Sequence, residues 1–184
     1  LVVDNGKQRE ALVVDRLAIG EVWWFGDADL YSDTGVRVLE GDVLPLSVGD
    51  SEISVVGFSV LDWPAALSRR DNYACAREVL AKAPEDRFRI MVHHFPEVAA
   101  LGVEAGADLG LAGDTHGGQI RLPVLGPLVR ILRLGGYFDV GLHRVGEGLL
   151  YVNRGIGMEG SWAPRVRFRC RPEVTLIEIV PKDR

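Results

Sequence analysis

The sequence predicts one α/β or α+β domain in which a layered β-sheet packs against a few helices. Three observations lead to this fold class. The 184 residues are enough for one domain with a sizeable core. The composition, 47% hydrophobic and 26% charged, is typical of globular proteins and excludes a disordered or collagen-like chain. Short apolar runs bounded by turn residues, typical of strands, dominate the sequence. Between some of these runs lie segments whose apolar residues have helical spacing.

The expected elements follow from local patterns in chain order. Residues 1–35 hold apolar pieces and the aromatic cluster 23–25, which we expect to be short strands or core. Apolar residues at helical spacing over 72–83 predict a helix that Pro84 ends. Gly146-Glu147-Gly148 predicts a hairpin turn. The full expectation is strands at 36–39, 43–46, 54–60, 88–92, 109–112, 142–145, 149–153 and 174–180, and helices at 72–83 and 98–101.

Charge and cysteine content limit the binding partners and the disulfide bonds that we expect. The net charge of −5 argues against a nucleic acid as a specific partner. Two cysteines, Cys75 and Cys170, cannot form a disulfide framework, and we expect two buried thiols, although one bridge is possible. Arginine alternates with other residues over 165–171, which predicts a solvated strand face or, as the second interpretation, an anion-binding edge.

The residues that could bind a metal or take part in catalysis follow the ends of two predicted strands. The strand 88–92 ends in His93-His94, and the strand 109–112 ends in a turn that contains Asp114 and His116. Ligands bind at the carboxyl ends of strands in layered folds, and imidazole and carboxylate are common metal ligands. Neighbouring side chains on an extended chain point to opposite faces, so we expect only one of the two adjacent histidines, with His94 as the candidate, to face a site.

The spacing in the second turn suits two metal donors. On an extended segment, residues 114 and 116 project to the same side, where they could bind one metal or two adjacent metals. The alternative remains open that the histidines are hydrogen-bonded structural residues and that this turn is closed by a side-chain cap.

The segment 113–123, Gly-Asp-Thr-His-Gly-Gly-Gln-Ile-Arg-Leu-Pro, resembles the Gly-His-Thr-His-Gly-Gly-Gln motif of calcineurin-like metallophosphoesterases. It is most similar to the bacterial branch whose members are often membrane-associated or exported. Other segments resemble the same branch in the same order, and the resemblance covers about residues 35–180. These segments are 35–40, 90–97, 150–157 and 171–178.

The resemblance implies a two-layer β-sandwich flanked by helices and a site for two divalent metal ions, among Mn, Fe, Zn and Mg, at the strand ends. His94 would bind the second metal and His116 the first. Asp114 stands where the family has a histidine ligand of the second metal. This departure adds negative charge and favours a harder ion.

A second departure lies upstream of these residues. The family's Asp-x-His, Gly-Asp-x-x-Asp and Gly-Asn-His-Asp motifs, which supply the other ligands and a catalytic histidine, have no counterpart in this sequence. The first residue is Leu1 rather than Met. We therefore expect residues 1–184 to be a single partial metallophosphoesterase domain whose N-terminal part is missing.

Two hypotheses for function follow from the resemblance. The first is a hydrolase that cleaves phosphomonoesters, phosphodiesters or pyrophosphates with metal-activated water, acts on a phosphorylated small molecule or a lipid-linked substrate, and uses Arg121 or Arg154 to neutralise phosphate. The full-length protein would then be bacterial and cytoplasmic, or membrane-associated or exported. The second is a truncated or degenerate relative that catalyses nothing and binds at most one metal or a partner.

Overall fold

The computed structural model describes residues 39, 41–48, 51–57, 69–128, 138–158 and 165–180 in full, and the backbone alone of five N-terminal strands. These five are β1 (Val2–Asp4), β2 (Arg9–Val13), β3 (Ala18–Ile19), β4 (Val22–Trp23) and β5 (Val36–Val38). β1, β2 and β5 form one sheet, and β3 pairs with β4. The side chains of the predicted aromatic cluster 23–25 lie outside the described residues.

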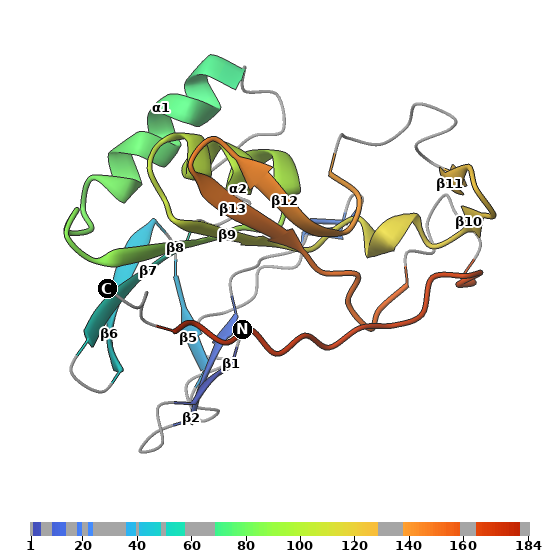
Figure 1. Cartoon of the computed structure of the whole chain (residues 1–184), viewed down its shortest axis with the longest axis horizontal. Coiled ribbons are helices and arrows are strands. Elements are labelled where there is room, and N and C mark those ends of the chain that lie inside the picture. Colours follow the sequence, from blue (N-terminus) through green and yellow to red (C-terminus); the bar gives the residue numbers. More distant parts are fainter. Residues whose placement is uncertain are drawn as a thin grey trace.

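A mixed sheet forms the centre of the molecule (Figure 1). Within the described residues it has six strands in the order β12-β13-β9-β8-β7-β6. Its four central strands are parallel, and the outer strands β12 and β6 run antiparallel to their neighbours. The strands are β6 (Asp42–Val48), β7 (Ser51–Gly57), β8 (Phe88–Val92), β9 (Leu109–Ala112), β12 (Gly141–Val145) and β13 (Gly148–Val152).

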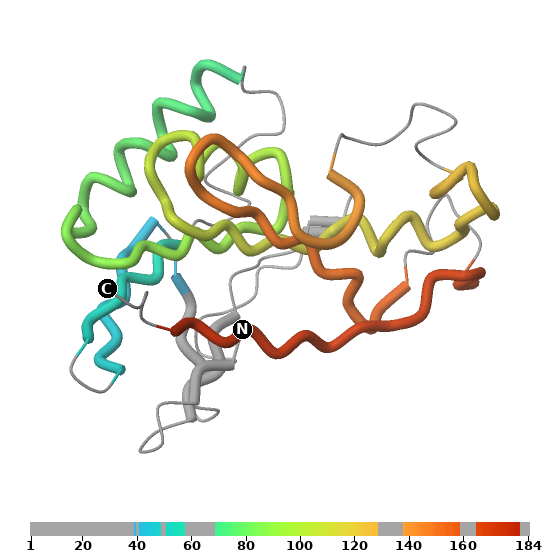
Figure 2. Tube along the Cα trace, viewed as in Figure 1, coloured from blue at the N-terminus to red at the C-terminus, as the bar shows by residue number. Residues whose placement is uncertain are grey.

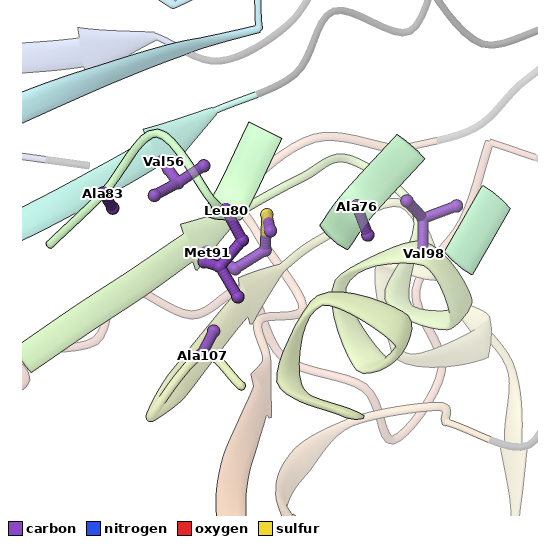
Figure 3. Packing of buried hydrophobic residues seen from close by; sticks show 7 residues of the cluster. All are labelled: Val56, Ala76, Leu80, Ala83, Met91, Val98 and Ala107. Atoms are coloured by element: carbon purple, nitrogen blue, oxygen red, sulfur yellow. The ribbon is translucent and has the colours of Figure 1, made fainter. Parts of the chain in front are cut away.

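Two helices cover one face of this sheet. α1 (Arg69–Leu80) and α2 (Pro96–Glu104) are the connections that parallel strands require. Leu80 of α1 packs with Val56 of β7 and Met91 of β8 in one apolar cluster, which Figure 3 shows from close by. α2 packs further along the sheet, where Val103 meets Leu150 of β13.

The opposite face of the sheet is also apolar. Val55 and Ile90 precede Val56 and Met91, so the alternation of a strand turns them away from the helices. They pack with Leu39, Leu44 and Leu46 in a second cluster. Because Leu39 directly follows β5, the chain leaving the N-terminal sheet helps to cover this face. The observed architecture is thus mixed α/β and consistent with a metallophosphatase-like fold.

The C-terminal segment departs from the prediction. Residues 165–180 run as an extended trace across the molecule (Figure 2). Apart from one bridge between Ile120 and Phe168, they form no ladder with the described strands, so the predicted strand 174–180 is wrong. The remaining short pieces follow β9: a 3₁₀ turn (His116–Gly118), β10 (Arg121–Leu122) and β11 (Gly126–Pro127).

No helix in the described part of the chain is both long and apolar enough to cross a membrane. Both cysteines are free; Cys170 is buried as expected, whereas Cys75 is half-buried.

Candidate functional site

The carboxyl ends of three parallel strands are held side by side. Hydrogen bonds continue past the strand ends: the His93 amide donates to the Leu111 carbonyl (3.0 Å), and the Gly113 amide donates to the His94 carbonyl (3.2 Å). Asn153, which follows β13, donates its amide to the last carbonyl of β9 (2.8 Å). The two histidine-containing turns are therefore brought to one edge of the sheet, as the resemblance and the strand pattern predicted.

The two adjacent histidines divide between core and edge. His93 is 2% exposed, and its Nδ1 accepts a hydrogen bond from the Phe95 amide (3.0 Å). The side chain of His94 is 18% exposed and points to Asp114 in the loop that follows β9. The two rings therefore have different surroundings, as the alternation of an extended chain predicted, and that His94 faces a metal site stays a prediction.

His94 and Asp114 meet at the strand ends. Nε2 of His94 lies 3.0 Å from Oδ1 of Asp114. This is the distance of a direct ion pair or hydrogen bond, and it is also the separation of two donors bound at right angles to one cation at about 2.1 Å each, so the contact is compatible with both arrangements. An imidazole with a carboxylate suits the intermediate and harder ions of the predicted set.

The pair alone is not a complete metal site. Within the described ranges, no group of three or more His, Cys, Asp or Glu side chains is placed to hold a metal ion. His94 and Asp114 would supply at most two ligands of a cation, and that they bind one stays a prediction.

The turn after β9 is folded more tightly than its spacing suggests. Asp114 (φ 64°), His116 (φ 47°) and Gln119 (φ 48°) have left-handed backbone conformations, and 116–118 forms a 3₁₀ turn. The Thr115 hydroxyl accepts a hydrogen bond from the Gly117 amide (3.2 Å) and donates one to the Asp139 carbonyl (2.6 Å). The expectation of an extended segment is wrong here, and the alternative of a turn closed by a side-chain cap is confirmed, with Thr115 as the cap. Left-handed positions of this kind also occur at functional sites.

In this conformation, the two predicted ligands in the turn, Asp114 and His116, contact different parts of the chain. Asp114 meets His94, whereas Nδ1 of His116 lies 3.2 Å from the Gly157 carbonyl oxygen. The buried Cys170 thiol donates a hydrogen bond to the His116 carbonyl (3.2 Å). That His116 binds a metal stays a prediction.

The two candidate phosphate-binding arginines each pair with a carboxylate. Nη1 of Arg121 lies 2.9 Å from Oδ2 of Asp139 and also donates to the Gly117 carbonyl (3.0 Å). Nε of Arg154 pairs with Oε2 of Glu173. Both guanidinium groups hold the loops around the strand ends, and their role toward a substrate stays a prediction.

A polar network fastens the C-terminal segment to the end of β13. The Glu173 carboxylate accepts hydrogen bonds from the hydroxyl of Tyr151 and from Thr175, beside its pair with Arg154. Burial raises the pKa of Tyr151, and the hydrogen bond to Glu173 raises that pKa further. Burial by itself would raise the pKa of Glu173, but the hydrogen bonds from Tyr151, Thr175 and Arg154 outweigh it and lower that pKa below its ordinary value.

Sequence reasoning missed Asp139, Glu173 and Arg167 as parts of this region. Asp139 is a single acid without a motif around it, whereas Glu173 lies in the family-like segment 171–178, whose resemblance assigns it no role. Arg167 belongs to the alternating arginine run, but its side chain is half-buried against the turn while Arg165, Arg169 and Arg171 are exposed. The expected single solvated face is therefore wrong, and alternation alone contains no signal that distinguishes Arg167.

Fold and site together define a mixed α/β protein with a candidate cation site at the ends of parallel strands. The chain is similar to an uncharacterized metallophosphoesterase, YkuE, of Bacillus subtilis (strain 168), with 35% identity over 100 residues. It is also 36% identical over 92 residues to the phosphodiesterase YaeI of Escherichia coli (strain K12), and 34% identical over 94 residues to the uncharacterized metallophosphoesterase Cj0846 of Campylobacter jejuni.

These similarities cover part of each protein. They span 54%, 50% and 50% of this chain, and 34%, 32% and 23% of the respective relatives. No model of a known protein family matches the chain. No solved structure matches it either. The relatives support the phosphoester hydrolases as the family to which this chain is related.

Proposed function

We propose that this chain carries part of the metal centre of a phosphoester hydrolase. The observation that supports the proposal most is the 3.0 Å approach of His94 Nε2 and Asp114 Oδ1 at the ends of two adjacent parallel strands. The substrates would be phosphomonoesters, phosphodiesters or pyrophosphates, on a small molecule or a lipid-linked group. The names of the relatives, metallophosphoesterase and phosphodiesterase, agree with this reaction class.

The residues of this chain would have separate tasks. His94 and Asp114 would hold a divalent cation, and His116 would present its ring from the same turn. When bound, such cations polarise phosphoryl oxygens and lower the pKa of bound water. Arg121 and Arg154 would keep positive charge beside the strand ends, although their carboxylate partners offset much of it.

A second candidate function is binding without catalysis. The absence of a third His, Cys, Asp or Glu ligand among the described residues favours it, because two protein ligands leave a cation weakly held. In that case the chain would bind one metal or a partner and would not hydrolyse phosphoesters.

Manganese binding tests the proposal directly. We expect calorimetry to show that the chain binds Mn²⁺ and that His94→Ala and Asp114→Asn each weaken binding by at least about tenfold. His143→Ala is the matched control, since it removes an imidazole from β12, where His143 contacts the Val140 carbonyl instead of the pair. Equal Mn²⁺ binding by the unmodified chain and by the three variants would contradict the proposal.

Hydrolysis separates the two candidate functions. We expect Mn²⁺-dependent release of nitrophenol from bis-p-nitrophenyl phosphate or p-nitrophenyl phosphate, and the preferred probe distinguishes diester from monoester chemistry. Metal binding without release from either probe would favour the non-catalytic function.

A further inference from the structure

The half-buried arginine of the C-terminal segment joins two turns that are distant in sequence. The guanidinium of Arg167 donates through Nε to the Gly157 carbonyl (3.0 Å) and through Nη2 to the carbonyls of Gly157 (2.5 Å) and Arg154 (2.8 Å). Its Nη1 donates to the His116 carbonyl (3.2 Å). One side chain therefore ties the loop after β13 to the turn after β9.

The same guanidinium orders the surroundings of the His116 ring. Nδ1 of His116 lies 3.2 Å from the Gly157 oxygen and 3.4 Å from Nη2 of Arg167. The two hydrogens of Nη2 have nearer acceptors, the carbonyls of Gly157 and Arg154. A carbonyl oxygen can only accept a hydrogen bond, so the contact between Nδ1 and the Gly157 oxygen is a hydrogen bond only in the tautomer that carries the proton on Nδ1.

We propose that Arg167 is a positioning residue that holds the Gly157 carbonyl against Nδ1 of His116 and so fixes the tautomer whose Nε2 can accept a cation. This role rests on the proposed function, in which His116 is a metal ligand. Hydrogen bonding at one ring nitrogen sets the ligand form of the other in metal sites, and loss of such a partner costs about 10- to 100-fold in metal affinity. The rigid fork of arginine suits this task because it reaches several carbonyls at once.

The imidazole nitrogens report the tautomer without metal or substrate. We would record long-range ¹H–¹⁵N spectra of the ¹⁵N-labelled, metal-free chain at alkaline pH, and assign His116 by its loss in His116→Gln. We expect protonated Nδ1 in the unmodified chain and a mixture of both tautomers in Arg167→Ala. Arg171→Ala, which removes an exposed arginine of the same run, should retain protonated Nδ1.

Metal affinity gives the second readout. We expect Arg167→Ala to bind Mn²⁺ about 10- to 100-fold more weakly than the unmodified chain, Arg167→Lys to lie between them, and Arg171→Ala to match the unmodified chain. If Arg167→Ala does not fold, Arg167→Lys decides, because its single ammonium keeps the charge but cannot bridge the same carbonyls.

Three results would overturn the inference: protonated Nε2 in the unmodified chain, an unchanged tautomer in both Arg167 variants, or the same change in Arg171→Ala. Failure of the proposed function is distinguishable from these results. An unmodified chain that binds no Mn²⁺ refutes the metal centre, whereas the tautomer result still shows whether Arg167 orders the His116 ring.

Discussion

At the scale of single residues, Glu173 connects the extended C-terminal segment to the end of β13. Its carboxylate is largely buried and accepts hydrogen bonds from Tyr151, Thr175 and Arg154. Charged hydrogen bonds of this kind each contribute about 1.5–3 kcal/mol. The segment that carries Arg167 and Cys170 is therefore fastened by a group that can titrate.

Because the pKa of Glu173 is lowered in the folded state, the stability of the protein depends on pH in the acidic range. Because the folded state holds this pKa below the ordinary value of 4.5, the unfolded chain takes up the proton first as the pH falls. The stabilisation is present above pH 4.5 and is lost as the pH falls through the folded-state pKa. We expect the thermal midpoint to fall in this range and the fall to be smaller in Glu173→Gln.

Glu178→Gln is the control for that measurement, since Glu178 is an exposed acid of the same segment. Its acid dependence should follow that of the unmodified chain. Identical acid profiles for Glu173→Gln and the unmodified chain would show that the network does not contribute to stability.

At the scale of elements, α2 approaches β9 closely because Gly110 has no side chain. A Cβ at Gly110 would lie 2.9 Å from Cγ2 of Val103, 3.0 Å from Cδ1 of Leu150 and 3.3 Å from the Ala99 carbonyl oxygen. The helix backbone cannot yield without moving from the sheet. Since β9 positions Asp114, this packing also sets the place of the candidate site.

Gly110→Ala therefore overpacks the contact between helix and strand. We expect it to lower the free energy of unfolding by about 1–3 kcal/mol, measured by urea denaturation. Gly113→Ala is the matched control, because a Cβ at Gly113, one residue beyond the same strand, meets nothing within 4 Å. A loss of equal size in both variants would contradict the packing argument.

At the scale of the whole molecule, the C-terminal segment leaves apolar side chains in solvent. Val174 is 88% exposed and Leu176 is 95% exposed, and the neighbouring Ile177, Ile179 and Val180 are exposed as well. A contiguous exposed apolar stretch in an extended conformation favours association with other chains.

We expect the unmodified chain to associate with itself as its concentration rises, and Val174→Ser with Leu176→Ser to reduce this association. Light scattering coupled to size exclusion measures the mass of each. Val124→Ser is the control, since Val124 is fully exposed but lies outside the segment. A monomeric unmodified chain at all concentrations would refute this expectation.

Local pattern was enough to predict most elements of the described fold. The ranges predicted for β8 and β9 match the structure, whereas α1 begins at Arg69 and ends at Leu80, earlier at both ends than the predicted 72–83, so Pro84 does not end the helix. These elements are readable because their apolar spacing reflects burial on one or both faces. The segment 174–180 has a similar apolar pattern but no strand partner among the described residues, which spacing cannot reveal.

The sequence by itself determined that two strands end in histidine-containing turns and that one of the adjacent histidines faces their common edge, because periodicity and chain order are local properties. Only the tertiary structure decided that Asp114 meets His94, that His116 turns to Gly157, and that Arg167 alone among the described arginines of its run is half-buried against these turns. The physical reason is that left-handed backbone at Asp114 and His116 redirects both side chains, and that each contact joins segments far apart in the chain.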